Sequence, residues 1–229
     1  MLCRALVLWF NKHGRSYPWR DSGDPFKVLV AEMMLRRTRA DQVESAYKEL
    51  FGRYPDAQSL AEGNSDEVAD ILYPLGLKWR TPAFQEVARA IVKDYGGKVP
   101  SKRHELLKLT GVGDYVAGAV LSIGYGKKEW IVDTNIVRVF RRYFGISTSV
   151  EGRRDKRIIE LAKVYARARN PRQANLAILD FAALICGAKN PRHDVCPLKR
   201  KCRYLRTDVM KISGMAEARV VRINFKGVK

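Results

Sequence analysis

The sequence predicts an all-α protein, and three observations lead to this prediction. Along most of the 229 residues, apolar side chains recur every three or four positions, the spacing that places them on one face of a helix. Glycine, serine and aspartate residues separate these segments where helices end and begin. Residues 219–225 form the one segment that has the alternating pattern of a β-strand.

The expected helices follow one another closely along the chain. Ser65 precedes two acidic residues, which favour a helix start, and Gly76 fits the end of that helix. A Gly-Gly pair ends a later helix, and a Thr-Gly-Val-Gly turn at residues 110–113 separates two short ones. The helices, preceded by an N-terminal one, are expected at residues 26–35, 42–51, 65–75, 84–95, 101–107, 114–123, 134–144, 154–167 and 173–185.

The charge of the chain favours a polyanionic partner. Lys and Arg number 43 against 24 Asp and Glu, which gives a formal net charge of +19. Nucleic acid is the most common partner of so basic a protein, and a basic surface without a partner or an acidic membrane surface are the alternatives. Lys or Arg interrupts each long apolar run before it reaches the length of a membrane span. We therefore expect a soluble, intracellular, cytoplasmic protein, and the scarcity of Asn and Gln is typical of thermophiles.

The turn between the two short helices has the features of a phosphate-binding site. Glycine permits positive φ angles and the close approach of another backbone. The unpaired amides at the start of the next helix point outward, where the helix dipole favours an anion, and a DNA phosphate needs such donors without sequence readout. We therefore predict that Gly111, Val112 and Gly113 bind DNA, although most glycine-flanked turns bind nothing.

The order of the motifs resembles a known family. The hairpin (Leu-Thr-Gly-Val-Gly, residues 109–113), a helix, and residues 132–139 (Val-Asp-Thr-Asn-Ile-Val-Arg-Val) resemble the helix-hairpin-helix plus Gly-Pro-Asp motif of the endonuclease III superfamily of DNA glycosylases. The resemblance extends from about residue 6 to residue 204. It includes residues 17–20 (Tyr-Pro-Trp-Arg), residues 31–38, the loop at residues 76–77 and the C-terminal cysteines.

This resemblance implies two helical domains with a cleft between them. Residues 23–134 are expected to form the six-helix barrel domain with the helix-hairpin-helix, and residues 1–22 and 135–207 the helical iron–sulfur cluster domain. Residues 208–229 form a basic C-terminal tail, for which contact with DNA and simple solvation are equally good interpretations.

Three residues are the catalytic candidates. Removal of a base breaks an N-glycosidic bond through a transition state with oxocarbenium character, which a carboxylate can stabilise. Asp133 matches the family's aspartate, and it is also a good helix N-cap, two roles that are compatible. Tyr115 stands where bifunctional members carry the lysine that forms a Schiff base, which a phenol cannot form; helix packing is its alternative role. Glu32 lies in an apolar segment, and the resemblance implies that it hydrogen-bonds or protonates the extruded base, the alternative being an exposed helix position.

Further residues are expected to hold the DNA once the base has left the stack. The resemblance implies that Leu77 and Arg36 fill the gap, with Lys78 and Arg37 beside them on the DNA. A place in the core is the alternative for Leu77, and a general phosphate contact is the alternative for Arg36.

The cysteines indicate a metal site. Three of the four lie within seventeen residues, and clustered thiols in an intracellular chain indicate metal binding more than disulfides. The family pattern is four cysteines separated by six, two and five residues; here the spacing is intact, but histidine takes the second place. The resemblance therefore implies a structural 4Fe-4S cluster held by Cys186, His193, Cys196 and Cys202. Cys3 as fourth ligand, a labile or incomplete cluster, and zinc are the alternatives.

Two branches of the family fit the sequence. Thymine and uracil glycosylases acting opposite guanine resemble it in the segment from Leu35 to Thr38, in the placement of Tyr115 and in length. Adenine glycosylases share Glu32 but usually carry glutamines in place of Arg36 and Arg37, and a further C-terminal domain for which about 25 residues after Cys202 are too few. We expect a monomeric, monofunctional enzyme that removes thymine or uracil from mispairs with guanine in double-stranded DNA, associated with the nucleoid. An adenine glycosylase, a non-catalytic DNA-binding protein and a lyase-type endonuclease are the alternatives.

Overall fold

The computed structural model describes residues 2–36, 38–76, 81–148 and 151–206. None of these residues lies in a β-strand, so the prediction of an all-α fold is confirmed for the described part of the chain. The candidate strand at residues 219–225 lies outside the described residues. Every helix in the described ranges is too short or too polar to cross a lipid bilayer.

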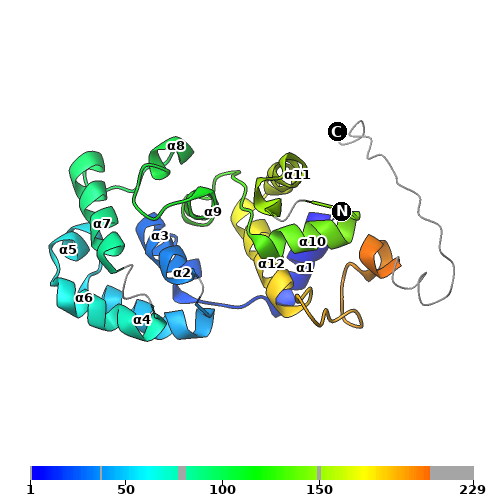
Figure 1. Cartoon of the computed structure of the whole chain (residues 1–229), viewed down its shortest axis with the longest axis horizontal. Coiled ribbons are helices and arrows are strands. Elements are labelled where there is room, and N and C mark those ends of the chain that lie inside the picture. Colours follow the sequence, from blue (N-terminus) through cyan, green and yellow to red (C-terminus); the bar gives the residue numbers. More distant parts are fainter. Residues whose placement is uncertain (1, 37, 77–80, 149–150, 207–229) are drawn as a thin grey trace.

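The helices form two groups that lie next to each other along the long axis of the molecule (Figure 1). One group, the hairpin lobe, consists of α2 (Pro18–Asp21), α3 (Pro25–Met34), α4 (Ala40–Arg53), α5 (Ala57–Glu62), α6 (Ser65–Leu72), η1 (Tyr73–Leu75), α7 (Thr81–Tyr95), α8 (Arg103–Leu106), α9 (Asp114–Ala119) and η3 (Val120–Gly124), which continues α9 with π-helical geometry. The other group, the terminal lobe, consists of α1 (Leu2–His13), α10 (Thr134–Phe144), η4 (Gly152–Arg154), α11 (Lys156–Ala166), α12 (Pro171–Leu184) and η5 (Lys199–Lys201).

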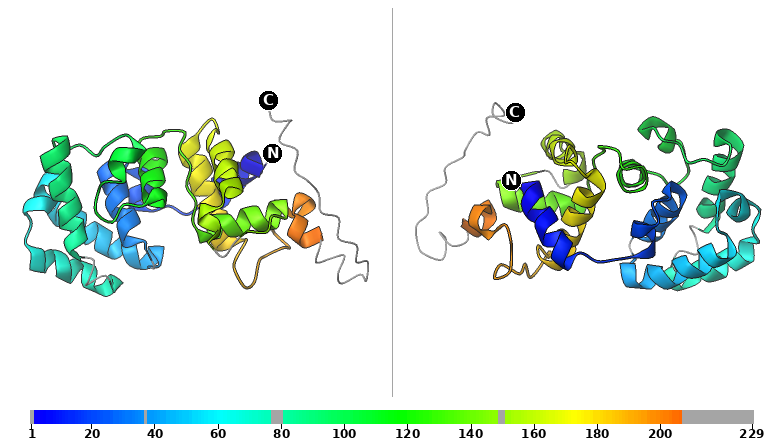
Figure 2. Two further views of the ribbon diagram at one scale, coloured as in Figure 1. Left: turned by 45° about the horizontal axis from the view of Figure 1, so that its top comes forward. Right: turned by 180° about the vertical axis from the view of Figure 1, so that it is seen from behind.

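Apolar packing holds each lobe together and joins the two. In the hairpin lobe, α5 packs on α7, and α3 packs on both α9 and η3. In the terminal lobe, α1 packs along α12, so that the N-terminal helix and the last α-helices of the described residues share one lobe (Figures 1 and 2). The η3 segment also contacts α12 and thereby links the lobes. One continuous cluster of buried apolar side chains results.

Local sequence signals set the helix ends that matter for the cleft. Asp24 caps α3 by accepting a hydrogen bond of 2.8 Å from the Phe26 amide, and a proline occupies the first helical position. Asp133 caps α10, which ends at Gly145 with φ = 68°, a left-handed conformation that favours glycine. The helix expected from residue 154 begins at Lys156, because η4 precedes it and Asp155 serves as its cap.

Candidate active site

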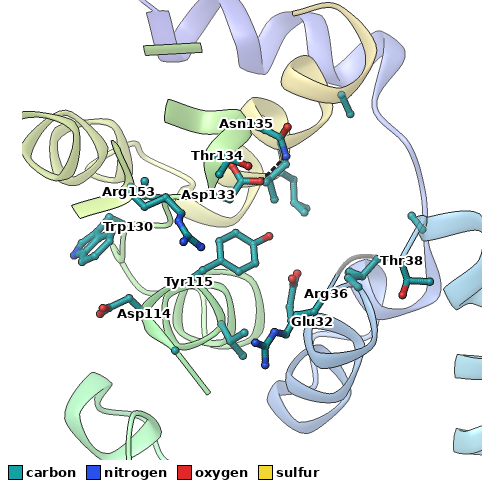
Figure 3. A pocket seen from close by; sticks show the side chains of 18 of the residues that line it. Glu32, Arg36, Thr38, Asp114, Tyr115, Trp130, Asp133, Thr134, Asn135 and Arg153 are labelled. Atoms are coloured by element: carbon teal, nitrogen blue, oxygen red, sulfur yellow. Dashed lines mark hydrogen bonds between the residues drawn. The ribbon is translucent and has the colours of Figure 1, made fainter. Parts of the chain in front are cut away.

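A cleft of about 1020 Å³ opens between the two lobes. Its walls come from α3, the hairpin turn and α9 on one side, and from the start of α10, η4 and α12 on the other (Figure 3). All three catalytic candidates line this cleft, as do several of the residues predicted to contact DNA: Glu32, Tyr115 and Asp133, with Arg36, Gly111 and Gly113. Segments far apart in the sequence thus meet in one cavity.

Glu32 is a buried acid on the wall of the cleft. It lies on α3, and only 5% of its surface is exposed. Burial raises its pKa to about 7, because it penalises the charged form; the negative charge of Asp133 acts in the same direction. The positive charge of Arg20 and a hydrogen bond with Tyr115 oppose this rise. The carboxyl group is therefore poised to exchange a proton near neutral pH, the property required of a general acid or base. The exposed position considered for Glu32 is not what the structure shows.

Tyr115 connects the two acids. Its ring extends from the second residue of α9 into the cleft, and its hydroxyl points toward the Glu32 carboxylate (Figure 3). Burial, together with the negative charges of Glu32 and Asp133, raises the pKa of the phenol well above its usual value. The hydroxyl is therefore protonated at neutral pH and available as a hydrogen-bond donor.

Asp133 is held at the lip of the cleft by the helix that it caps. One carboxylate oxygen accepts a hydrogen bond of 2.7 Å from the Ile136 amide, and the other accepts one of 2.7 Å from Nδ2 of Asn135. These two bonds fix the carboxylate at the N-terminus of α10 (Figure 3). Capping and an orientation toward the cleft are thus compatible, as the sequence suggested.

The hairpin turn forms the edge of the cleft next to α3. Gly111 has φ = 77°, whereas Gly113, the N-cap of α9, is extended at φ = −104°, so only the first glycine uses a left-handed conformation. Gly113 is exposed and Val112 is buried, which leaves the backbone at the start of α9 open on one side. Nη1 of Arg36 donates a hydrogen bond of 3.3 Å to the Gly111 carbonyl and so joins α3 to the turn.

Three of the predicted DNA contacts, Arg37, Leu77 and Lys78, lie outside the described residues. Thr38, which follows the first of them, donates a hydrogen bond of 3.4 Å from its hydroxyl to the Leu75 carbonyl. This bond ties the end of α3 to the loop that leads to residue 77.

A buried ion network that the sequence did not predict joins Asp180 to Arg15 and Arg20, two residues that line the cleft. The side chain of Asp180, on α12, is fully buried and receives both the Arg15 and the Arg20 guanidinium groups. Arg20 makes two bonds of 2.9 Å to it, and Arg15 makes bonds of 2.7 and 3.0 Å. The network links the segment between α1 and α2 to α12 and holds a positive charge near Glu32. Asp180 interrupts the apolar run at residues 176–184 of α12, and this was the one sequence signal that could have identified it.

Trp130 and Arg153 also line the cleft without having been predicted. The Arg103 guanidinium lies over the Trp130 ring, 4.2 Å from its centroid, and Arg103 Nη2 donates 2.9 Å to the Trp130 carbonyl. An added Cβ at Gly118 would lie 2.1 Å from that carbonyl, so only glycine permits this packing of α9. The signal available in the sequence was a large aromatic residue three positions before Asp133.

The predicted metal ligands surround a second, smaller cavity. Cys186, His193, Cys196 and Cys202 line it together with Arg142 and Tyr204. Arg142 contacts two of the thiols: its Nη1 lies 3.5 Å from Cys186 Sγ, and its carbonyl oxygen lies 3.5 Å from Cys202 Sγ. The described residues contain no group of three His, Cys, Asp or Glu side chains already placed to hold a metal ion. Three thiols and an imidazole around one cavity are nevertheless a donor set suited to iron or zinc.

Cys3, considered as a replacement ligand, lies elsewhere. It belongs to α1, and its thiol hydrogen-bonds with Tyr165 of α11. Burial raises the pKa of this thiol. The structure therefore places Cys3 in the packing between α1 and α11 and not among the residues around the second cavity.

Known proteins are similar to this chain in sequence and in architecture. Residues 30–164 match the family model described as HhH-GPD superfamily base excision DNA repair protein. A thymine/uracil-DNA glycosylase of Methanothermobacter thermautotrophicus is 36% identical over 201 residues, which cover 87% of this chain and 91% of the relative. Another thymine/uracil-DNA glycosylase, from Pyrobaculum aerophilum, is 38% identical over 202 residues, covering 85% and 86%.

A solved structure agrees with these relatives. A thermostable thymine-DNA glycosylase superposes with a TM-score of 0.85 at 34% identity, covering 90% of this chain and 95% of that one. The resemblance predicted from the hairpin and the Asp133 motif is confirmed by these matches. The chain belongs to the HhH-GPD superfamily of base excision DNA repair proteins.

Proposed function

We propose that this protein is a monofunctional DNA glycosylase that removes thymine or uracil mispaired with guanine from double-stranded DNA. The observation that carries the proposal is the meeting of Glu32, Tyr115 and Asp133 in one cleft beside the hairpin turn. The similarity to thymine/uracil-DNA glycosylases at 36% and 38% identity supports the choice of base.

DNA first binds at the hairpin turn and at the basic surface of the protein. The exposed backbone at Gly113 and the amides that start α9 contact phosphates of one strand, which sets the register without reading sequence. Leu77 and Arg36 occupy the space left by the extruded nucleotide, and Lys78 and Arg37 contact the DNA beside them. The mispaired base leaves the stack more easily than a paired one, which gives part of the selectivity.

Glu32 and Asp133 have different roles in the reaction. The base lies at Glu32, which donates its proton to the base as the N-glycosidic bond breaks and the electron pair leaves with the base. The Asp133 carboxylate stabilises the positive charge that develops on the sugar, and water then adds its oxygen to C1′ and releases one proton. Tyr115 donates its hydrogen bond to Glu32 and keeps that carboxyl group directed into the cleft.

The choice of base is tested with a panel of duplexes that carry T·G, U·G, A·G or A·oxidised-G pairs. Abasic sites are revealed by alkali after incubation. We expect strand breaks after alkali in the T·G and U·G duplexes alone. Cleavage of the adenine duplexes would favour an adenine glycosylase, and cleavage of none would favour a protein that only binds DNA.

The absence of an imine-forming lysine at position 115 leads to a second expectation. Because a phenol cannot form a Schiff base with the sugar, sodium borohydride should trap no covalent complex between the protein and a T·G duplex. The Tyr115→Lys variant provides the matched comparison, since an amine at this position is able to form the adduct. A covalent complex with the unchanged protein on a denaturing gel would contradict the monofunctional mechanism.

We also propose that Cys186, His193, Cys196 and Cys202 hold a 4Fe-4S cluster. The shared cavity and the soft donor set support this assignment, and zinc is the alternative metal. When bound, the group supplies a structural cross-link between the end of α12 and the basic segment around η5. Arg142 of α10 fixes the start of the loop that follows α12, since it also donates to the carbonyls of Gly187 and Ala188, at 2.6 and 2.9 Å.

The histidine ligand is tested by metal content. His193→Ala should lose most of the bound metal and lower the melting temperature, whereas His193→Cys, which restores the family pattern, should retain both. Iron, sulfide and zinc analysis with the visible absorption spectrum distinguishes a cluster from zinc. Unchanged metal content in His193→Ala would show that the imidazole is not a ligand.

A further inference from the structure

An arginine of the terminal lobe reaches into the cleft opposite Glu32. Arg153 lies in η4, and its guanidinium is directed toward the space bounded by Tyr115, Trp130 and Asp133 (Figure 3). Its side chain is 53% exposed, so that it is accessible from the cleft. None of the roles assigned above to the catalytic or hairpin residues uses this cation.

Close backbone packing fixes the place of Arg153 relative to Asp133. Gly152 is buried against α10, and an added Cβ there would lie 2.7 Å from Val137 Cγ1 and 2.9 Å from Thr148 Oγ1. Val137 lies one turn after Asp133 on α10 and donates its amide to the Asp133 carbonyl at 3.0 Å. The element that carries Arg153 is therefore positioned by the same helix start that positions the carboxylate.

The guanidinium is paired with a neighbour on its own element. Arg153 Nε donates 2.7 Å and Nη2 donates 3.1 Å to the two oxygens of Glu151. Asp133 is near enough for its charge to contribute to a raised pKa of Arg153, after the larger contributions of Glu151. The two Asp133 oxygens accept hydrogen bonds from α10, one from the Ile136 amide and the other from the Asn135 side chain. Two negative groups thus face one cation, and the geometry favours Glu151.

We propose that Arg153 binds a backbone phosphate of the extruded nucleotide, and that Glu151 holds the guanidinium away from Asp133 until DNA arrives. This inference rests on the proposed function, because it needs a nucleotide in the cleft. A sugar that faces Asp133 carries its phosphates near η4, and a guanidinium can take a phosphate with the same two parallel bonds that it makes with a carboxylate. The phosphate replaces Glu151 as the partner of Arg153. Pairing with Glu151 in the free protein leaves the negative charge of Asp133 available for the sugar.

The test compares affinity for two duplexes of one sequence. One contains a tetrahydrofuran abasic-site analogue opposite guanine, which is extruded without being cleaved, and the other is fully paired. Arg153→Gln should weaken binding to the analogue duplex about tenfold and reduce the slope of log affinity against log salt by roughly 0.9, the contribution of one phosphate contact. Binding to the fully paired duplex should remain within about twofold of the unchanged protein, because no nucleotide then enters the cleft.

Matched variants separate this role from a general charge effect. Arg53→Gln removes an arginine that is similarly exposed and also pairs with glutamates, at 3.2 Å with Glu49 and 3.7 Å with Glu67, but lies outside the cleft; it should change neither affinity. Glu151→Gln should strengthen binding to the analogue duplex, since the phosphate no longer competes with a carboxylate. An equal loss of affinity for both duplexes in Arg153→Gln, or an unchanged salt slope, would overturn the proposal. These readouts do not depend on excision, so failure of the proposed base specificity would be seen separately in the panel of mispairs.

Discussion

The Asp133→Asn variant should lose excision of thymine from a T·G duplex by about a thousandfold or more, while its affinity for the same duplex changes little. The carboxylate faces the cleft from the N-terminus of α10, where two hydrogen bonds of 2.7 Å hold it. An amide at this position still accepts a bond from the Ile136 amide, so the helix cap is retained. Only the negative charge opposite the developing sugar cation is removed.

Single-turnover rates and a binding titration measure the two quantities separately. Asp24→Asn is the control, because Asp24 caps α3 in the same way but is not among the residues that line the cleft. We expect that variant to excise at the rate of the unchanged protein. A rate for Asp133→Asn within about tenfold of the unchanged protein would contradict an electrostatic role, since removal of one such group usually lowers the rate by at least a hundredfold.

The second large effect is expected at Glu32. Glu32→Gln should excise about a hundred- to a thousandfold more slowly, because an amide can hydrogen-bond the base but cannot give it a proton. In the unchanged protein the carboxyl has a pKa of about 7, so the excision rate should fall about tenfold per pH unit above that value as the proton is lost. The remaining activity of the variant should not show this dependence on pH.

A second carboxylate paired with a tyrosine offers the matched control. Glu67 accepts a hydrogen bond of 2.9 Å from the Tyr54 hydroxyl, outside the cleft, so Glu67→Gln removes the charge of a similar carboxylate without changing a residue that lines the cleft. The Glu67→Gln variant should excise thymine at the rate of the unchanged protein and with the same dependence on pH. If Glu32→Gln retained the same fall in rate above neutral pH, another group would have to be the acid.

Glu32 also links the free energy of unfolding to pH. Its pKa in the folded protein is raised from 4.5 to about 7, so the folded state holds the proton more tightly than the unfolded chain does. The contribution of Glu32 is complete below the unfolded pKa and is lost as the pH rises through the folded pKa, an effect of up to about 3 kcal/mol. Denaturant titrations of Glu32→Gln should therefore show a smaller decline in stability between about pH 5 and pH 8.

Local and periodic features of the sequence were sufficient to predict the all-α class and most of the helices. Helical spacing indicated the all-α class, and the cap at Asp133 was identifiable because capping acts within one turn. Ser65 was expected to start its helix and is the first residue of α6, but the side chain that caps α6 is that of Asn64. The π-helical continuation at η3 was not predicted, because the same apolar pattern fits an α-helix. The hairpin was predicted, but the difference between its two glycines was not: Gly111 has φ = 77°, whereas Gly113 is extended at φ = −104°.

Some contacts in the site join residues that are far apart in the sequence, and these contacts could not be predicted. Asp180 lies 160 residues beyond Arg20 in the chain, and nothing in either local segment indicates that they pair. Arg153 lies in a run of charged residues that is typical of a solvated surface, and only the burial of Gly152 against α10 brings it to the cleft. Residues recognised through a motif, such as Asp133 and Tyr115, were identifiable because the motif fixes their spacing from the hairpin.

A crystal structure of the Asp133→Asn variant bound to a duplex with a T·G mispair would test the arrangement most directly. We expect the thymidine to lie outside the helical stack, with its base edge at Glu32, C1′ facing position 133 and its phosphate backbone near Arg153. A thymidine that remains stacked, or one that is extruded into a different cavity, would contradict the assignment of this cleft.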